Sequence, residues 1–283
     1  MKIKAIWDLL RLEHGLMYGI GVIIGAVVAS KNVNFLKILL GFLTAVFLQA
    51  SAFSLNDYID YETDLENKRY DRPLVRGDLS RHHALILCLI LAPPGFLASY
   101  LISIKAFLFA FIITLLGYLY DIKIKKFGLA GNVYIALSMA APFIFGGIIA
   151  IDNINPAIIM LSLLAFLSGV AREIMKGIED IKGDAIRDIR TLARVKGIAF
   201  ASKTSSLIYI LAVILSFIPF LLIQEYKYDL KYLIPVLITD AILIKTSYEL
   251  VKPDVTPKKI SKLRKLTLIG FLFGLVGFIL GAF

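Results

Sequence analysis

The 283-residue sequence predicts an all-α integral membrane protein. Hydrophobic residues make up 59% of the chain, and only 18% of the residues are charged. The mean hydropathy is +0.81, and the apolar residues form long continuous runs instead of alternating with polar ones. A transmembrane β-strand needs that alternation, whereas a helix crosses the bilayer with about 20 consecutive apolar residues. Composition and pattern together exclude a soluble globular domain and a membrane β-barrel.

Nine apolar segments are long enough, or nearly so, to cross a bilayer as helices. The third segment contains Pro93-Pro94, which should kink its helix. No low-complexity tract or linker divides the chain, so we expect a single membrane domain over residues 1–283. The segments lie at about residues 15–30, 35–55, 84–104, 106–121, 128–151, 154–171, 205–223, 230–251 and 266–283.

Positive charges are distributed unequally between the two sides of these segments. Of the 31 Lys and Arg residues, 26 lie at the N-terminus and in the loops after even-numbered segments, and 5 lie on the opposite side. Cytoplasmic loops carry the excess of Lys and Arg, so this distribution predicts a cytoplasmic N-terminus and an outer C-terminus. The long charged loops 2–3 (about 57–83) and 6–7 (about 172–203) both fall on the cytoplasmic side and are compatible with helix.

The net charge of +10 at pH 7 suits anionic lipid head groups and phosphorylated substrates, because most of the positive residues lie in loops between apolar segments. We therefore expect no nucleic acid partner, and nothing in the sequence indicates an obligate protein partner. The single cysteine, Cys88, lies inside an apolar segment, which excludes a disulfide framework and a thiolate metal site. The N-terminal residues show no small-residue cleavage pattern, so we expect no cleavable signal.

Two acidic motifs lie where apolar segments end on the predicted cytoplasmic side. Asn56, Asp60 and Asp64 follow the second segment at i, i+4 and i+8, so on a helix they share one face. Asp57 lies off that face. Asp180 and Asp184 follow the sixth segment at i, i+4, and the helical pattern continues from that segment, so both acids are expected on its extension.

Such rows of oxygen ligands suit magnesium carrying a diphosphate. Mg²⁺ prefers hard oxygen ligands and is usually bound jointly by carboxylates, waters and substrate phosphates. Bound there, the ion would stabilise negative charge on a departing diphosphate. Neighbouring cations would complete the site, with Arg binding phosphate in bidentate fashion and Lys acting as a point charge. These cations are Lys68, Arg69, Arg72, Lys123, Lys125, Lys126, Arg172 and Lys176.

The alternative is that the acids lie on solvated interfacial helices and merely pair with nearby Lys and Arg. A single Asp-x-x-x-Asp would favour that interpretation, because the spacing is common on surface helices. Two motifs on the same side of the membrane, the first extended by an asparagine, favour the metal site.

The stretch that begins at Asn56 closely resembles the first signature of the UbiA superfamily of intramembrane prenyltransferases. The matching residues are Asn56-Asp57-x-x-Asp60-x-x-x-Asp64, followed by Asn67, Arg69 and Arg72-Pro73-Leu74. Asp180-x-x-x-Asp184, followed by Arg190-Thr191-Leu192, is similar to the second signature. That signature often has Gly where Asp188 stands and Pro where Ala193 stands, so the resemblance does not extend to the local geometry at these two positions.

The resemblance spans the whole chain and implies nine transmembrane helices around a central cavity, with a cytoplasmic helical cap from loops 2–3 and 6–7. It implies that Mg²⁺ and a prenyl diphosphate are held at both motifs, with substrate also bound by Asn67 and the cations beside them. The metal ligands so implied are Asn56, Asp60, Asp64, Asp180 and Asp184, and the four aspartates are the expected catalytic residues.

Within the family, residues 67–80 and Arg172-Glu173-Ile174 are most similar to the archaeal branch. That branch includes the enzyme that forms the second ether bond of archaeal membrane lipids. The resemblance thus implies geranylgeranyl diphosphate as donor and a phosphorylated glycerol ether lipid, geranylgeranylglyceryl phosphate, as acceptor. A family member with an aromatic acceptor, as in quinone or haem side-chain synthesis, is the alternative.

Two other classes fit less well. A secondary transporter would place its polar groups near the bilayer midplane within inverted repeats, whereas these acids lie at the cytoplasmic rim. A CDP-alcohol phosphotransferase would need an Asp-x-x-Asp-Gly run that this sequence lacks.

Several other polar residues leave more than one interpretation open. Asp240 lies in the middle of the eighth segment and is either functional or part of a buried hydrogen-bonded pairing. Tyr118 and Tyr120, beside Asp121, would contact substrate or form an aromatic belt at the interface. The basic stretch 258–265 is interpreted as an anchor for lipid head groups.

Overall fold

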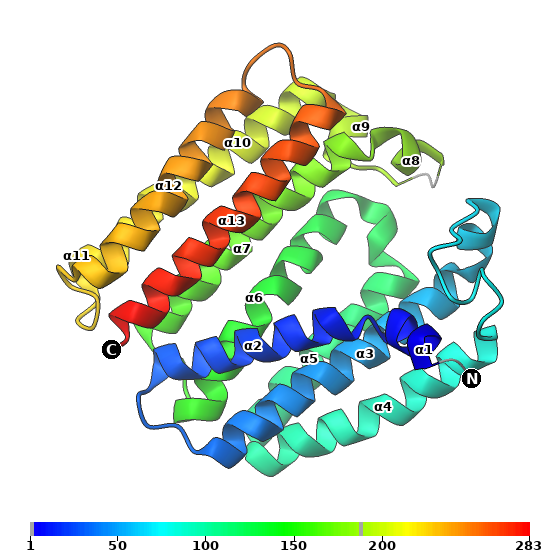
Figure 1. Ribbon diagram of the computed structural model, residues 1–283, viewed down its shortest axis with the longest axis horizontal. Coiled ribbons are helices and arrows are strands. Elements are labelled where there is room, and N and C mark those ends of the chain that lie inside the picture. Colours follow the sequence, from blue (N-terminus) through cyan, green and yellow to red (C-terminus); the bar gives the residue numbers. More distant parts are fainter. Residues whose placement is uncertain (1–2, 187–188) are drawn as a thin grey trace. The chain divides into compact units, whose positions relative to one another are not determined.

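The computed structural model describes residues 3–186 and 189–283, which fold into helices joined mostly by short connections. The α-helices, shown in Figure 1, are α1 (Ile3–Leu10), α2 (Leu12–Ala29), α3 (Phe35–Glu66), α4 (Arg81–Ile102), α5 (Ile104–Ile122), α6 (Leu129–Ile151), α7 (Pro156–Glu179), α8 (Ile181–Ile186), α9 (Leu192–Lys196), α10 (Ile198–Leu215), α11 (Phe217–Leu222), α12 (Leu230–Leu250) and α13 (Pro257–Gly281). A 3-10 turn, Ile124–Phe127, joins α5 to α6.

The predicted all-α membrane fold is confirmed, since each of the nine apolar segments coincides with a helix of the described chain. In that part of the chain, 8 helices are long and apolar enough to cross a membrane, with α10 and α11 counted together. The remaining segment, α12, contains three charged residues in every 18-residue stretch, which sets it apart from the other eight. The count of nine spans therefore stays a prediction.

The helical cap expected from loop 2–3 is only partly present. α3 continues without a break through the first acidic motif to Glu66, and Asn67 caps its C-terminus. The rest of the loop, residues 67–80, forms turns and bends, so the expectation of helix there is wrong. A residue in the left-handed region, Lys68 with φ of 53°, interrupts the helical path at this point.

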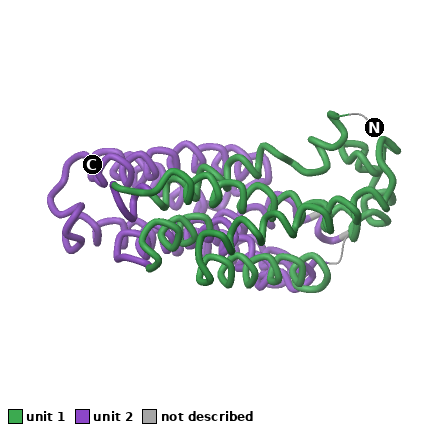
Figure 2. Tube along the Cα trace, turned by 90° about the horizontal axis from the view of Figure 1, so that it is seen from below, with its two compact units in different colours: residues 1–26, 32–124, 142–153 green, residues 27–31, 125–141, 154–283 purple. Residues whose placement is uncertain are grey.

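The described chain divides into two compact units, coloured separately in Figure 2. Unit 1 comprises residues 1–26, 32–124 and 142–153, and unit 2 comprises residues 27–31, 125–141 and 154–283. The first acidic motif belongs to unit 1 and the second to unit 2. The expected single domain over residues 1–283 stays a prediction.

Unit 1 is built on α3, α4 and α5, which pack against one another, and on a close contact between α2 and the second half of α6. Gly25 and Gly146 make that contact possible. A Cβ atom on Gly25 would lie 2.4 Å from the carbonyl oxygen of Phe143, and one on Gly146 would lie 2.4 Å from that of Val22. Small residues let membrane helices approach to backbone distance, so these two positions fix how α2 crosses α6.

The N-terminal helix α1 packs on the turns that follow the first motif. Ala5 and Leu9 of α1 are buried in a small apolar cluster with Leu74 and Leu79. Arg11, at the junction of α1 and α2, adopts a left-handed conformation with φ of 46°. This part of unit 1 is thus formed by two segments that lie more than 60 positions apart in sequence.

Unit 2 is a bundle in which α7 packs against α10 and α13, and α12 packs against the same two helices (Figure 1). Its core includes Ile174 and Met175 of α7, Tyr209 of α10, Leu250 of α12 and Ile260 of α13. The core reaches the end of α7 and so provides a rigid base for the second acidic motif.

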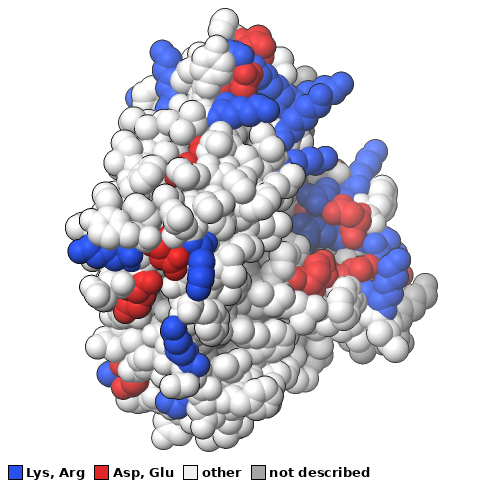
Figure 3. Space-filling view, turned by 60° about the vertical axis from the view of Figure 1, so that its left-hand side comes forward, with Lys and Arg blue, Asp and Glu red and all other residues white. Residues whose placement is uncertain are grey.

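On the face in Figure 3, Lys, Arg, Asp and Glu side chains form separate groups around a broad uncharged surface, as expected for a chain that lies in lipid.

Candidate active site: two acidic motifs and their cations

The first motif is a row of side chains on the last third of α3. Asn56, Asp60 and Asp64 all lie within this uninterrupted helix, so the predicted spacing of one turn between neighbours is present. Asn56 Nδ2 donates to Asp60 Oδ2 at 3.2 Å. Asp64 is buried, while Asn56 and Asp60 are half-buried. The helix therefore presents three oxygen-bearing side chains along one line.

A fourth polar side chain joins this row from another helix. Asn56 Nδ2 also donates to Asp121 Oδ1 of α5 at 2.8 Å. Asp121 is only 5% exposed. In the sequence, Asp121 stands out only as a neighbour of two tyrosines, although its helical spacing points to burial. The buried positions of α5 are Ala106, Ala110, Thr114, Gly117 and Asp121, which follow helical spacing and continue the buried face to the end of the helix.

Asp57 lies off the row, as its position in the helix predicts, and binds two arginines. Its Oδ1 atom accepts hydrogen bonds from Arg11 Nη2 at 2.6 Å and Arg72 Nη1 at 3.2 Å. The carboxylate is 2% exposed. Arg72 also lies beside the row, since its Nε atom is 3.7 Å from Asp64 Oδ2. A buried anion thus holds one of the predicted phosphate-binding cations next to the motif.

The other residues after the first motif divide between local roles and open positions. Asn67 Nδ2 donates to the carbonyl oxygen of Thr63 at 2.7 Å and so caps α3. Arg69 binds Asp71 through two hydrogen bonds of 2.8 Å. These hydrogen bonds, and to a lesser extent the nearby motif acids, raise the pKa of Arg69, so this cation stays fully charged beside the row. Lys68 is exposed to solvent.

The second motif is split between two helices. α7 ends at Glu179, Asp180 forms its C-cap, and Asp184 lies in the short helix α8. The expectation that both acids lie on one extension of the sixth segment is therefore wrong. One helical hydrogen bond nevertheless crosses the break, from the backbone N–H of Asp184 to the carbonyl oxygen of Asp180 at 2.9 Å. It keeps the two acids one turn apart.

An arginine organises the backbone around the second motif. Arg194 of α9 donates through Nη1 to the carbonyl oxygens of Asp184 at 2.9 Å and Ile189 at 2.7 Å. Asp180 is exposed and Asp184 is half-buried. Asp188, where the sequence departs from the family signature, lies outside the described residues.

One cation near the second motif comes from α13, outside the predicted set. Arg264 of α13 forms an ion pair with Glu179 at the end of α7. It belongs to the stretch 258–265 interpreted as a lipid anchor, and that interpretation is wrong for this residue. The helical spacing indicates that Arg264 faces the protein, because Ile260 and Thr267 are buried and Arg264 falls on the same face of α13. Lys259 of the same stretch also forms ion pairs within the protein, so it is not free to bind lipid head groups.

Other predicted cations lie in α7 and at the C-terminus of α5. Arg172 of α7 is half-buried, and its Nε atom is buried with no hydrogen-bond partner among the described residues. Lys176 lies 3.8 Å from Glu173 and remains half exposed. Lys123 is an exposed residue that caps the C-terminus of α5.

Each motif, taken by itself, has the residue types of a magnesium site that a substrate completes. In the described part of the chain, no group of three or more His, Cys, Asp or Glu side chains is close enough to hold a metal by itself. Mg²⁺ is typically bound through one or two carboxylates together with waters and substrate phosphates, so it needs no such group. The amide nitrogen of Asn56 is engaged by two carboxylates, which leaves its oxygen for a cation.

Asp240, the intramembrane acid, has a structural partner. Its Oδ2 atom accepts a hydrogen bond from Ser216 Oγ at 2.8 Å, and Tyr232 donates to the carbonyl oxygen of Ser216 at 2.7 Å. Ser216 lies where α10 ends and α11 begins. The interpretation as a buried pairing is confirmed, and the partner is Ser216 instead of a neighbour on the same helix.

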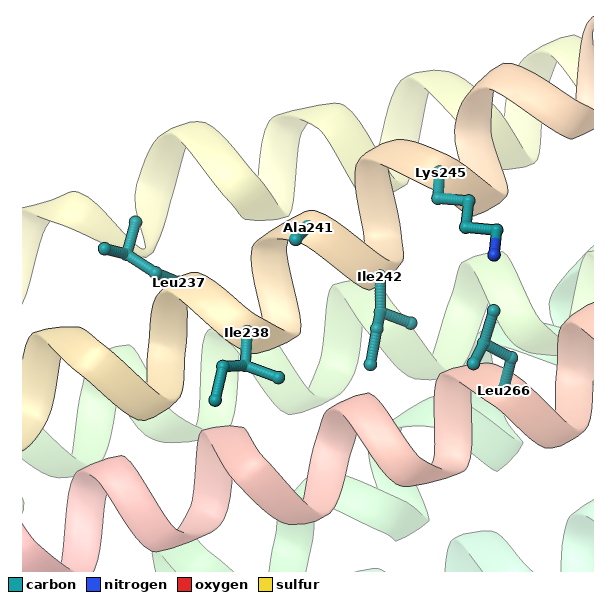
Figure 4. Close-up of a pocket in the computed structure, with 6 residues that line it drawn as sticks. All are labelled: Leu237, Ile238, Ala241, Ile242, Lys245 and Leu266. Atoms are coloured by element: carbon teal, nitrogen blue, oxygen red, sulfur yellow. The ribbon is translucent and has the colours of Figure 1, made fainter.

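An open apolar groove of about 420 Å³ lies between α12 and α13 (Figure 4). Its lining is Leu237, Ile238, Ala241, Ile242, Lys245 and Leu266. No residue of either acidic motif lines it, and among the six side chains labelled in Figure 4 the one polar atom is the amine nitrogen of Lys245. Its surface is that expected of a lipid-facing helix pair.

Comparisons with known proteins extend these observations. The model of the UbiA prenyltransferase family matches residues 19–269. A curated relative, the digeranylgeranylglyceryl phosphate synthase of Archaeoglobus fulgidus, is 58% identical over 282 residues, which cover 99% of this chain and 96% of the relative. A solved structure described as giving insights into digeranylgeranylglyceryl phosphate synthase in membranes has a TM-score of 0.86 and 32% identity, covering 99% of this chain and 98% of that one.

A second solved structure, a UbiA homolog from Archaeoglobus fulgidus bound to DMAPP and Mg²⁺, has a TM-score of 0.72 and 22% identity. It covers 97% of this chain and 98% of its own, and at that identity it supports the fold alone. The family model spans both acidic motifs and both compact units. This chain therefore belongs to the UbiA prenyltransferase family.

Proposed function

We propose that this protein transfers a geranylgeranyl group from geranylgeranyl diphosphate to the sn-2 hydroxyl of geranylgeranylglyceryl phosphate, in a reaction that requires Mg²⁺ and forms an archaeal ether lipid. The observation that carries this assignment is the 58% identity, over nearly the full length of both chains, to a relative named digeranylgeranylglyceryl phosphate synthase. In the reaction the C1–O bond of the donor breaks, diphosphate leaves, and the acceptor oxygen forms a new ether bond to C1 as it loses its proton.

The motif residues would hold the metal and the diphosphate. Asn56, Asp60 and Asp64 supply oxygen ligands from α3, and Asp180 and Asp184 supply them from the end of α7 and from α8. When bound, Mg²⁺ neutralises the charge that develops on the departing diphosphate. The chain itself contributes the positions of the ligands, which the helices fix before substrate arrives.

Cations beside the motifs would bind the phosphate oxygens. Arg72 is the best placed of them at the first motif, because Asp57 holds its guanidinium 3.7 Å from Asp64. At the second motif, Arg172 has a buried Nε atom with no acceptor in the described structure, so a phosphate oxygen would satisfy it. The other residues that we assign to substrate binding are Asn67, Lys68, Arg69, Lys123 and Lys176.

The membrane placement follows from the same proposal. The prenyl chain of the donor would enter from the bilayer, and both motifs with the N-terminus would lie on the cytoplasmic side. The distribution of Lys and Arg supports this orientation, with the C-terminus outside. Labelling of single cysteines introduced at either end of the chain, by a reagent that does not cross the membrane, would test it.

The assay is transfer of radiolabelled geranylgeranyl diphosphate by the purified protein in lipid nanodiscs, with and without Mg²⁺. The acceptors are geranylgeranylglyceryl phosphate, 4-hydroxybenzoate and a naphthoate. We expect Mg²⁺-dependent product with the first acceptor only. Product with an aromatic acceptor alone would replace the proposed acceptor. Asp60→Ala and Asp184→Ala should each abolish transfer in a folded protein, and near-normal turnover in both would refute the assignment of the motifs.

A further inference from the structure

The orientation of the Asn56 side chain is dictated by the groups around its amide nitrogen. Asn56 Nδ2 donates one hydrogen bond to Asp60 Oδ2, with an N···O distance of 3.2 Å, and one to Asp121 Oδ1, with an N···O distance of 2.8 Å. An ionised carboxylate only accepts hydrogen bonds, so the atom between these two acids has to be the nitrogen. If the amide were turned by 180°, its oxygen would face two carboxylate oxygens and both bonds would be lost.

This orientation leaves the amide oxygen directed away from both acids. Asn56 Oδ1 accepts no hydrogen bond from any residue in the described part of the chain. A hard cation such as Mg²⁺ binds the oxygen of an amide and not its nitrogen. The side chain therefore already has the orientation that a metal ligand needs, with its amide oxygen available to a cation.

Asp121 is held firmly enough to impose that orientation. It is 5% exposed and lies at the end of α5, outside both sequence motifs. About one turn earlier on the same two helices, Ser51 Oγ and Tyr118 Oη lie 2.7 Å apart in a hydrogen bond. This second bond fixes the register of α5 against α3, so the carboxylate of Asp121 meets the Asn56 amide in a set position.

We propose that Asp121 is a positioning residue that orients the Asn56 amide so that its oxygen faces the divalent cation. The inference rests on the proposed Mg²⁺ site and adds a residue that neither motif contains. Outer residues that hold a metal ligand by a hydrogen bond commonly change metal affinity by about 10- to 100-fold when they are removed. A catalytic base at this position would behave differently, because that role needs the ionisable carboxylate.

Two substitutions separate these roles. Asp121→Asn keeps an oxygen that accepts a hydrogen bond from Asn56 Nδ2 but removes the charge. Asp121→Leu has a similar size and removes the acceptor. If Asp121 orients the Asn56 amide, Asp121→Asn should retain metal affinity within about threefold. Asp121→Leu should weaken it by about 10- to 100-fold. Equal loss in both variants would show that the charge is what matters and would overturn the proposal, as would wild-type affinity in Asp121→Leu.

Metal affinity is to be measured directly, by electron paramagnetic resonance titration of Mn²⁺ into the protein with an unreactive prenyl thiolodiphosphate and no acceptor. This readout does not depend on turnover or on the identity of the acceptor. Failure of the proposed function would appear as absence of product with normal metal binding in the wild type. Failure of the present inference would appear in the Mn²⁺ titration of the variants.

A double-mutant comparison tests whether Asp121 acts through Asn56. In the background of Asn56→Ala, the change Asp121→Leu should weaken Mn²⁺ binding no further, since the amide that it orients is gone. A further tenfold loss would contradict the proposal.

If Asp121→Leu does not fold, Asp121→Ala replaces it. Alanine also removes the acceptor for Asn56 Nδ2, so Mn²⁺ binding should weaken by about 10- to 100-fold relative to the wild type. Wild-type affinity in Asp121→Ala would overturn the proposal.

Discussion

Replacement of Asp57 by alanine tests how the first motif holds its cations. The carboxylate is 2% exposed, and it binds Arg11 and Arg72, whose side chains are 17% and 20% exposed. Removing one partner of a buried ion pair costs about 3–5 kcal/mol. Because water still reaches both arginines, we expect the lower limit, a loss of about 3 kcal/mol in the free energy of unfolding. For a chain of this size that loss lowers Tm by roughly 6–12 °C.

The measurement is thermal unfolding of the detergent-solubilised protein, followed by intrinsic fluorescence. Glu62→Ala is the matched control, since Glu62 lies on the same helix and pairs with Arg81 at 3.4 Å but is 67% exposed. An exposed pair contributes about 0.2–1 kcal/mol, so the control should shift Tm by no more than a few degrees. Asp57→Ala should also raise KM for the prenyl diphosphate, because Arg72 loses its anchor. Equal Tm values for both variants would refute the role given to the buried carboxylate.

Two further outcomes are expected. Arg264→Ala should destabilise the protein by about 1–2 kcal/mol, because it removes a charge-assisted bond to Glu179, whereas Lys262→Ala on an exposed position of α13 should change stability by less than about 0.5 kcal/mol. Thermal melts of both variants decide this, and equal melts would contradict the ion pair. Arg69 holds the pKa of Asp71 below its usual range, so the pair stabilises the fold above the unfolded pKa of about 3.9, and this contribution is lost as pH falls through the folded value. The difference in Tm between wild type and Asp71→Asn should be small at pH 7 and should vanish near pH 2, and a difference that grows in acid would contradict this sign.

Local periodicity made much of this molecule predictable. The row formed by Asn56, Asp60 and Asp64 depends only on 3.6 residues per turn, so it could be placed on one helix face from the sequence. The same rule separated Asp57 from the row, and the structure gives Asp57 a different set of contacts. Apolar length likewise located the helices, since lipid demands nearly the same length from each of them.

Contacts between distant segments were not predictable in this way. Asn56 and Asp121 are 65 positions apart, and Arg264 and Glu179 are 85 positions apart. Which helices meet, and at which height, depends on side-chain packing that a single sequence does not reveal. The break at Asp180 was missed for a related reason, because α8 is held by Arg194 from a separate helix and not by its own sequence pattern. For Asp121 and Arg264, the helical spacing of the buried positions on α5 and α13 indicates a buried face, but not which residue that face meets.

The unbroken length of α3 places the chemistry at a defined depth. Its 32 residues span about 48 Å, compared with about 30 Å of hydrocarbon in a typical bilayer. Measured from Phe35, Asn56 lies about 32 Å along the helix and Asp64 about 44 Å. With Phe35 at the opposite edge of the hydrocarbon, we expect the row to begin where the hydrocarbon ends and to continue into the head-group region. A stiff rod of this kind converts any change in bilayer thickness or helix tilt into a change in the height of the carboxylates above the lipid tails. The distance between a buried isoprenoid chain and its charged head group is fixed by chemistry, so turnover should peak in membranes whose thickness matches this helix and fall in thinner or thicker ones.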